Sequence, residues 1–179
     1  LASKYRKIKM LNNNQEIINK SSTIILGITP NVGNKILPKL IFSKKKRIIS
    51  LIATINLEKL KKITKNKNIV RVTPLPPVEI NKGPIVICPP NKNVKNIFKH
   101  LGTVIEIRNE RQSHKFWSTA SVMAAFYEIL NVSSNWLTKN GIKKNTANKY
   151  IAELFLSLSQ DAANKESQGF KKLVTDSQT

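Results

Sequence analysis

The stretch KRIISLIATINLEKLKKI, residues 46–63, decides the fold class. It opens with a run of apolar and β-branched residues, which is typical of a buried strand. A short turn of small residues follows, and apolar residues then recur at helical spacing at Leu57, Leu60 and Ile63. The stretch therefore predicts a strand, a turn and an amphipathic helix, the repeating unit of a parallel α/β sheet.

Similar units lie on either side of this stretch. Apolar runs predict further strands at 22–28, 69–74, 83–90 and 103–109, with a short strand in YRKIKM at 5–10. Helical stretches separate most of these runs. Strands without polar alternation are buried on both faces, and helices between parallel strands make right-handed crossovers. We therefore predict a doubly wound α/β sheet over residues 1–110.

Beyond residue 110 the pattern becomes helical. Residues 118–141 predict a helix that ends at Gly141, and residues 145–165 predict a second helix with one apolar face. The first helix is small and apolar almost all round, so two helices alone cannot enclose it. A second copy of the chain is the favoured way to bury it, and packing against the sheet domain is the alternative. We predict an all-α domain over residues 111–179.

The formal net charge of +21 is typical of proteins that bind nucleic acid or another polyanion. The 31 basic residues include only five arginines, however, and the lysines are scattered through every segment. One cluster, SKKKR at 43–47, has no aromatic residues interleaved with it, as a base-stacking surface needs. We predict no specific nucleic-acid partner, and polyanion binding that weakens with salt is a minor alternative.

Membrane, disulfide and metal functions are not indicated. The sequence has no uncharged apolar stretch of about eighteen residues, and its first residues lack the apolar core of a signal peptide, so we expect a cytoplasmic protein without a membrane partner. Cys88 is the only cysteine. His100 and His114 have no cysteine or carboxylate pattern around them, and we predict no metal ion.

Three turns follow predicted strands at the edge of the sheet where ligands bind in this class of fold. Their sequences are GITPNV at 27–32, LIATIN at 51–56 and VTPLPP at 72–77. They contain no acid, base or activated nucleophile, so no catalytic residue is predicted. A dinucleotide needs only close backbone approach and apolar walls there, because the cofactor itself carries the hydride chemistry. Ordinary turns without a ligand are the alternative.

Three stretches in this order resemble the pyrroline-5-carboxylate reductase family, and the resemblance continues to FKKLVTDSQT at the end of the chain. They are NNQEIINKSSTIILGITPNV at 13–32, RIISLIATINLEKLKK at 47–62 and VRVTPLPPVEINKGPIVI at 70–87. The resemblance implies a Rossmann-like domain that binds NADPH or NADH, followed by a helical dimerisation domain that can also build larger homo-oligomers. It also implies a small-molecule substrate, the cyclic imine 1-pyrroline-5-carboxylate, which is reduced to proline.

The same resemblance implies site residues by position. The residues that it assigns to the cofactor are Asn14, then Ile28, Thr29 and Pro30 after one strand, and Ala53 and Thr54 after the next. The end of the chain would lead into the loop at the substrate carboxylate. The substrate-binding residues implied there are Thr175, Ser177 and Thr179. Hydroxyl and N–H groups can bind a carboxylate without a full positive charge.

The sequence also departs from that family. It contains no G-x-G-x-x-G, so the resemblance places the phosphate-binding turn before residue 1 and the Pro-Gly-Gly substrate loop after residue 179, and we expect a fragment of a longer protein. Leu75 and Pro76 stand where the family has Asn and Thr, which removes side-chain hydrogen bonds. A paralogue that binds nucleotide, or that serves as a binding or regulatory protein without the reaction, is therefore the alternative to the reductase.

Overall fold

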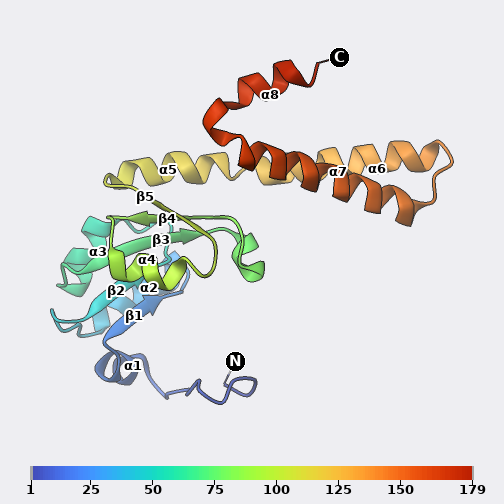
Figure 1. The fold of residues 1–179 in the computed structure, drawn as a ribbon. Coiled ribbons are helices and arrows are strands. Elements are labelled where there is room, and N and C mark those ends of the chain that lie inside the picture. The colour runs from blue at the N-terminus through green and yellow to red at the C-terminus, as the bar shows by residue number, and fades with distance from the viewer. Residues whose placement is uncertain (1, 179) are drawn as a thin grey trace. The chain divides into compact units, whose positions relative to one another are not determined.

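In the computed structural model, which describes residues 2–178, five strands form one sheet with the order β1-β2-β3-β4-β5 (Figure 1). The strands are β1 Thr23–Leu26, β2 Arg47–Ser50, β3 Ile69–Pro74, β4 Pro84–Cys88 and β5 Thr103–Glu106. β1, β2 and β3 are parallel to one another, β4 is antiparallel to β3, and β5 is parallel to β4. The carboxyl ends of β1, β2 and β3 therefore point to the same edge.

Helices connect most of the strands, and capping side chains determine where several of them begin. They are α1 Asn14–Lys20, α2 Pro30–Ile36, the 3-10 turn η1 Leu37–Lys39, α3 Leu57–Thr64, the 3-10 turn η2 Pro76–Ile80, α4 Lys92–Phe98 and α5 Glu110–Thr119. The Asn56 side chain accepts a hydrogen bond from Lys59 N, 2.7 Å, and Asn91 accepts one from Val94 N, 3.1 Å. Each cap satisfies one of the N–H groups that the first turn of a helix leaves unpaired.

The core lies on both faces of the sheet, as the unbroken apolar runs predict. Ile48 belongs to a cluster on one face with Leu26, Leu60 and Ile52, whereas its neighbour Ile49 belongs to a second cluster on the other face. Both isoleucines have no exposed surface. Because successive side chains of a strand point to opposite faces, both layers of helices bury apolar surface against β2.

The direction of β4 differs from the parallel arrangement that right-handed crossovers predict. Only the segment from Leu75 to Gly83 links β3 to β4, whereas a parallel connection needs about a dozen residues or more. The segment contains η2 and turns back through Asn81 and Gly83, which have φ angles of 57° and 90°. A short link therefore produces an antiparallel pair.

Two further predictions differ from the structure. Residues 5–10, predicted as a short strand, are exposed and contain no strand, and Ile8 N donates instead to Tyr5 O, 2.9 Å, in a turn. A neighbouring strand would have to bury this lysine-rich segment, which explains why it does not join the sheet. The helix predicted over 118–141 corresponds to α6, which begins at Val122, and a separate helix, α5, occupies Glu110–Thr119, where no helix was predicted.

The chain divides into two units, Leu1–Ser118 and Thr119–Thr179. In the second unit, α6 Val122–Lys139 and α7 Lys144–Asn164 form an antiparallel pair. The rings of Phe126 and Phe155 meet edge to face with centroids 5.8 Å apart, and Ser134 Oγ donates to Asn148 Oδ1. The 3-10 turn η3 Glu166–Gln168 and the helix α8 Phe170–Asp176 complete the chain. The predicted α/β fold with an all-helical C-terminal region is confirmed, and the assignment of functions to residues 1–110 and 111–179 stays a prediction.

The helical pair leaves much of its apolar surface exposed. Tyr127, Trp136 and Leu156 are 64%, 63% and 59% exposed, although all three are large and apolar or aromatic. The predicted enclosure of α6 by a second copy of the chain stays a prediction. None of the helices within residues 2–178 combines the length and the hydropathy that a membrane span requires.

Candidate functional site

Two loops meet at the edge where β1 and β2 end. Leu51 N donates to Leu26 O, 3.1 Å, which continues the ladder between the two parallel strands beyond Ser50. The loop after β1 contains Ile28 and Thr29 and enters α2 at Pro30, and the loop after β2 contains Ala53 and Thr54. The structure therefore brings these five predicted cofactor-binding residues to one edge of the sheet.

The two loops are held together through α2 and the isoleucines of the second loop. A Cβ atom built on Gly33 of α2 would lie 3.3 Å from the Cδ1 atoms of both Ile52 and Ile55, so glycine permits this close approach. Ile52 and Ile55 are 1% and 2% exposed. Between these buried anchors, Ala53 is half-buried and Thr54 is exposed, so the turn presents small side chains at the edge.

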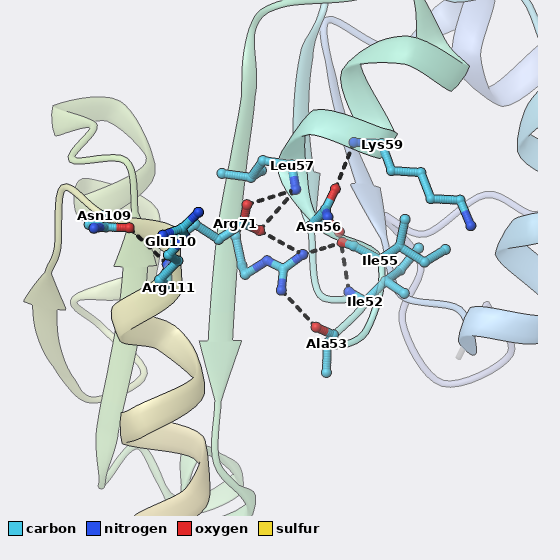
Figure 2. Close-up of polar contacts among 11 residues, drawn as sticks. Ile52, Ala53, Ile55, Asn56, Leu57, Lys59, Arg71, Asn109, Glu110 and Arg111 are labelled. Carbon is cyan, nitrogen blue, oxygen red and sulfur yellow. Dashed lines mark hydrogen bonds and ion pairs between the residues drawn. The ribbon is translucent and has the colours of Figure 1, made fainter.

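A buried arginine fixes the backbone of the second loop. Arg71 lies in the middle of β3 and its side chain is only 3% exposed. Its Nη1 donates to Ala53 O, 2.7 Å, and its Nη2 donates to Ile55 O. Nη2 also lies 3.0 Å from Glu110 Oε1, which forms an ion pair with it. Figure 2 shows the guanidinium between the loop and the carboxylate.

The carboxylate of Glu110 completes this constellation at the start of α3. Both of its oxygens accept from Leu57 N, at 2.9 and 3.0 Å. Leu57 N is one of the N–H groups that the helix cannot satisfy itself, and a carboxylate is favoured at that end of the helix dipole. Glu110 thus occupies the N-terminus of α3, which is not open to an external anion.

The electrostatics of Arg71 follow from its burial. Burial lowers the pKa of the Arg71 guanidinium, and the nearby carboxylate of Glu110 acts in the opposite direction. An arginine side chain nonetheless keeps its charge in proteins. The ion pair with Glu110 thus balances the charge of the buried guanidinium.

The sequence prediction missed both residues, although one signal was available. Arg71 stands in the run IVRVTP, which is otherwise apolar and buried on both faces. A charge at such a position must have a partner of opposite sign, because an unpaired buried charge is very costly. Nothing in the local sequence identifies Glu110 as that partner, since it follows β5 and enters the site from a different element.

Other reactive groups near the edge are not activated. Cys88 stands opposite Arg71 in the antiparallel pair of β3 and β4. Burial raises the pKa of its thiol, and Glu110 acts in the same direction, so the thiol stays protonated and is a poor nucleophile. No cluster of three or more metal-binding side chains occurs within residues 2–178.

The carboxyl end of β3 lies at the same edge and is apolar. Leu75 follows the strand and is half-buried, and Pro76 begins η2 and is exposed. Leu75 O accepts a hydrogen bond from Val78 N, 3.1 Å, inside the turn. Neither side chain can form a hydrogen bond with a ligand. This agrees with the loss of side-chain hydrogen bonds that we expect from the replacement of Asn and Thr by Leu75 and Pro76.

The remaining predicted site residues do not belong to these two loops. Asn14 is exposed at the start of α1. The side-chain amide of the neighbouring Gln15 contacts Ile41, ahead of β2: Nε2 donates to Ile41 O, 3.0 Å, and Oε1 accepts from Ile41 N, 2.9 Å. Thr175 Oγ1 and Ser177 Oγ donate to Lys171 O and Leu173 O at 3.2 and 2.7 Å. Their hydroxyl protons are therefore used inside the C-terminal region, and Thr179 lies outside the described residues.

No family model and no curated protein sequence matches the chain. Solved structures match it well. A 1-pyrroline-5-carboxylate reductase from Streptococcus pyogenes has a TM-score of 0.79 over 92% of this chain and 66% of that protein, with 22% sequence identity. A pyrroline carboxylate reductase from Plasmodium falciparum, with NADP bound, has a TM-score of 0.79 over 94% of this chain and 68% of that protein, with 20% identity.

A third match is a pyrroline-5-carboxylate reductase from Coxiella burnetii, with a TM-score of 0.75 over 94% of this chain and 67% of that protein, at 20% identity. This chain has the fold of pyrroline-5-carboxylate reductases. It spans about two thirds of the length of each of the three proteins. The Rossmann-like fold implied by the sequence resemblance is thereby confirmed, and at 20–22% identity the likeness is one of fold.

Proposed function

We propose that this chain is part of an NAD(P)H-dependent reductase that converts a cyclic imine, 1-pyrroline-5-carboxylate, to proline. The observation that carries the proposal is the edge at which β1 and β2 end: it has small side chains and a fixed backbone, and its carboxylate, Glu110, is already bound to Arg71 and Leu57 N. Such an edge suits a reaction whose chemistry is carried by a cofactor. The likeness of the fold to three pyrroline carboxylate reductases, one with NADP bound, supports the proposal.

The described residues fit the reactive half of a dinucleotide. Ala53 and Thr54 form a wall of small side chains on which a flat ring can lie, and Ile28, Thr29 and Pro30 form the wall after the neighbouring strand. The carboxylate of Glu110, which contacts this loop, is paired with Arg71 and accepts from Leu57 N, so it does not repel an anionic cofactor. When bound, NADPH or NADH supplies a hydride. We assign no preference between the two.

In this proposal the chain acts by binding and orientation. The two loops hold the reacting partners in a fixed arrangement, which by itself lowers the barrier of a two-substrate reaction substantially. The apolar side chains of Leu75 and Pro76 limit water at the end of β3. We further propose that Thr175, Ser177 and Thr179 contribute to binding the substrate carboxylate. To donate to it, the hydroxyl groups of Thr175 and Ser177 must release their present hydrogen bonds inside the chain. The proton for the imine nitrogen comes from water or a hydroxyl.

The assembly and the cellular role belong to the same proposal. The exposed apolar side chains of α6 and α7 favour a homodimer or a larger homo-oligomer, because a second copy can cover both helices. A proline-forming reductase acts in amino-acid biosynthesis, and we propose a cytoplasmic location for it.

One observation favours a second function, a paralogue that keeps nucleotide binding and has lost the reaction. The side chains of Leu75 and Pro76 offer no hydrogen bond at the end of β3, where a polar substrate would otherwise be recognised. This change affects the substrate side of the edge and leaves the loop at 53–57 intact. The two functions therefore differ in turnover and agree in nucleotide binding.

Turnover by the full-length gene product distinguishes them. The consumption of NADPH and of NADH is followed by absorbance with 1-pyrroline-5-carboxylate, and proline is quantified as the product. Saturable turnover with stoichiometric proline supports the reductase. Binding of NADPH without turnover supports the paralogue, and the absence of both activities contradicts the proposal.

A further inference from the structure

Arg71 has more partners than charge neutralisation requires. A single carboxylate would balance a buried guanidinium, yet the structure also directs its two terminal nitrogens to the carbonyl groups of Ala53 and Ile55. In the sheet register, Arg71 stands beside Ser50, the last residue of β2, so its side chain lies where the chain leaves that strand. The guanidinium thus contacts the backbone of the loop directly after β2.

Glu110 extends this contact to the end of the loop. It pairs with Arg71 and accepts from Leu57 N with both oxygens. Its own position is fixed at the start of α5, where Asn109 Oδ1 accepts from Arg111 N, 3.0 Å (Figure 2). The loop backbone is therefore held at residues 53, 55 and 57, every second residue from the turn to the first residue of α3.

Stability alone is a poor explanation for such a pair. Well-packed apolar residues of similar volume often replace a buried ion pair without loss of stability, because removing two charges from water is costly. What an apolar pair cannot do is bind two carbonyl groups and one N–H group. The contacts of Arg71 and Glu110 thus determine the conformation of one loop more than they contribute to the cohesion of the core.

We infer that Arg71 and Glu110 are positioning residues of the nucleotide site. They fix the loop at 53–57 in the conformation that presents Ala53 and Thr54 at the sheet edge, so that the protein does not have to order this loop when a ligand binds. Ordering a free loop on binding would weaken affinity. This inference rests on the proposed function for the identity of the ligand, and its claim about the loop can be measured without any ligand.

The test uses the full-length protein with the conservative substitutions Arg71→Lys and Glu110→Gln. Lysine keeps the charge but cannot reach two carbonyls and a carboxylate with a planar fork, and glutamine keeps the shape and one acceptor but loses the charge. The matched control is Glu106→Gln. Glu106 also accepts from a backbone N–H near a helix start, Asn91 N, 3.2 Å, and pairs with a cation, Lys95, at 2.7 Å, but these contacts hold α4.

Hydrogen exchange of peptides that cover residues 51–57 is measured without ligand, and the dissociation constant for NADPH is measured by titration. Both substitutions are expected to accelerate exchange in 51–57 by about tenfold and to weaken NADPH binding by about tenfold, the effect of losing one hydrogen bond to a charged group. The amides of β2 and β3 that exchange only by unfolding of the whole unit report the loss of overall stability separately. The control leaves exchange in 51–57 and NADPH affinity unchanged.

Two results would overturn the inference: exchange in 51–57 that stays at the wild-type rate, or a faster loop with unchanged NADPH affinity. If Arg71→Lys fails to fold, Glu110→Gln decides between these results. If the wild-type protein binds neither NADPH nor NADH, the proposed function fails, and the exchange rates of 51–57 alone decide whether Arg71 and Glu110 fix the loop.

Discussion

Replacing Arg71 by methionine should destabilise the sheet unit by about 3 kcal/mol. The side chain is 3% exposed, and its removal leaves Glu110 as a charge without its cation. Breaking a buried ion pair from one side typically costs about 3–5 kcal/mol. Glu110 is 22% exposed and keeps its bonds from Leu57 N, so water and the helix start partly compensate and the lower end of that range applies.

A double-mutant cycle makes this prediction specific to the pair. Glu110→Gln alone should cost about 2 kcal/mol, because Arg71 then lacks its carboxylate while one acceptor remains for Leu57 N. In the variant that carries both Arg71→Met and Glu110→Gln, no charge is left without a partner, so the total loss should stay near 3 kcal/mol. The two single effects should therefore overlap by about 2 kcal/mol, as expected for residues in direct contact.

Native-state hydrogen exchange measures these values in the sheet unit itself. The backbone amides of Ile49 and Val70, both in buried strands, should exchange only when the unit unfolds. Their exchange rates then report the free energy of unfolding of that unit. Additive effects of the two substitutions would refute the pairing of Arg71 with Glu110. A loss below about 1 kcal/mol for Arg71→Met would show that the guanidinium is not buried as described.

Three further predictions concern other parts of the same unit. Asn56→Ala removes the side-chain acceptor that caps Lys59 N and should lower the free energy of unfolding by about 1 kcal/mol, measured by urea unfolding. Asn56→Asp keeps an acceptor and should retain most of the wild-type stability. The hydrogen bond from Lys95 lowers the pKa of Glu106, so its stabilisation is complete above the ordinary carboxyl pKa and is lost as the pH falls through the folded-state pKa. Thermal unfolding between about pH 2.5 and 6 should accordingly show a weaker acid dependence in Glu106→Gln, and an unchanged pH profile would contradict the contact. Cys88, buried and with a raised thiol pKa, should react with a thiol reagent at about pH 8 only after unfolding, and rapid reaction of the native protein would contradict its burial.

The sequence predicts those parts of the fold that depend on local pattern. The run at Ile48 and Ile49 indicates a strand buried on both faces, and the structure buries the two side chains in separate clusters. The turn at Ala53 and Thr54 is predicted at a ligand-binding edge because parallel neighbours end on the same side of a sheet. Both predictions need only periodicity and the rules of parallel topology.

The remaining features depend on contacts that no local pattern contains. An apolar run does not indicate the direction of its strand, so β4 was predicted as parallel, although the short link after Pro74 already favoured a hairpin. Arg71 and Glu110 are joined only by the fold, since one lies in β3 and the other follows β5. Their pairing could be predicted only in part, from the rule that a charge inside a buried strand requires a partner.

A titration of the full-length protein with NADPH, monitored by the amide resonances of Ala53 and Thr54, tests directly whether the nucleotide binds at this edge. We expect large, saturable shifts at these two residues and at Ile28 and Thr29 on the neighbouring loop, with small shifts at Asn91 beside the control residue Glu106. Saturable binding with no shift at Ala53 and Thr54 would place the nucleotide elsewhere. No binding at all would contradict the assignment of this edge to a nucleotide.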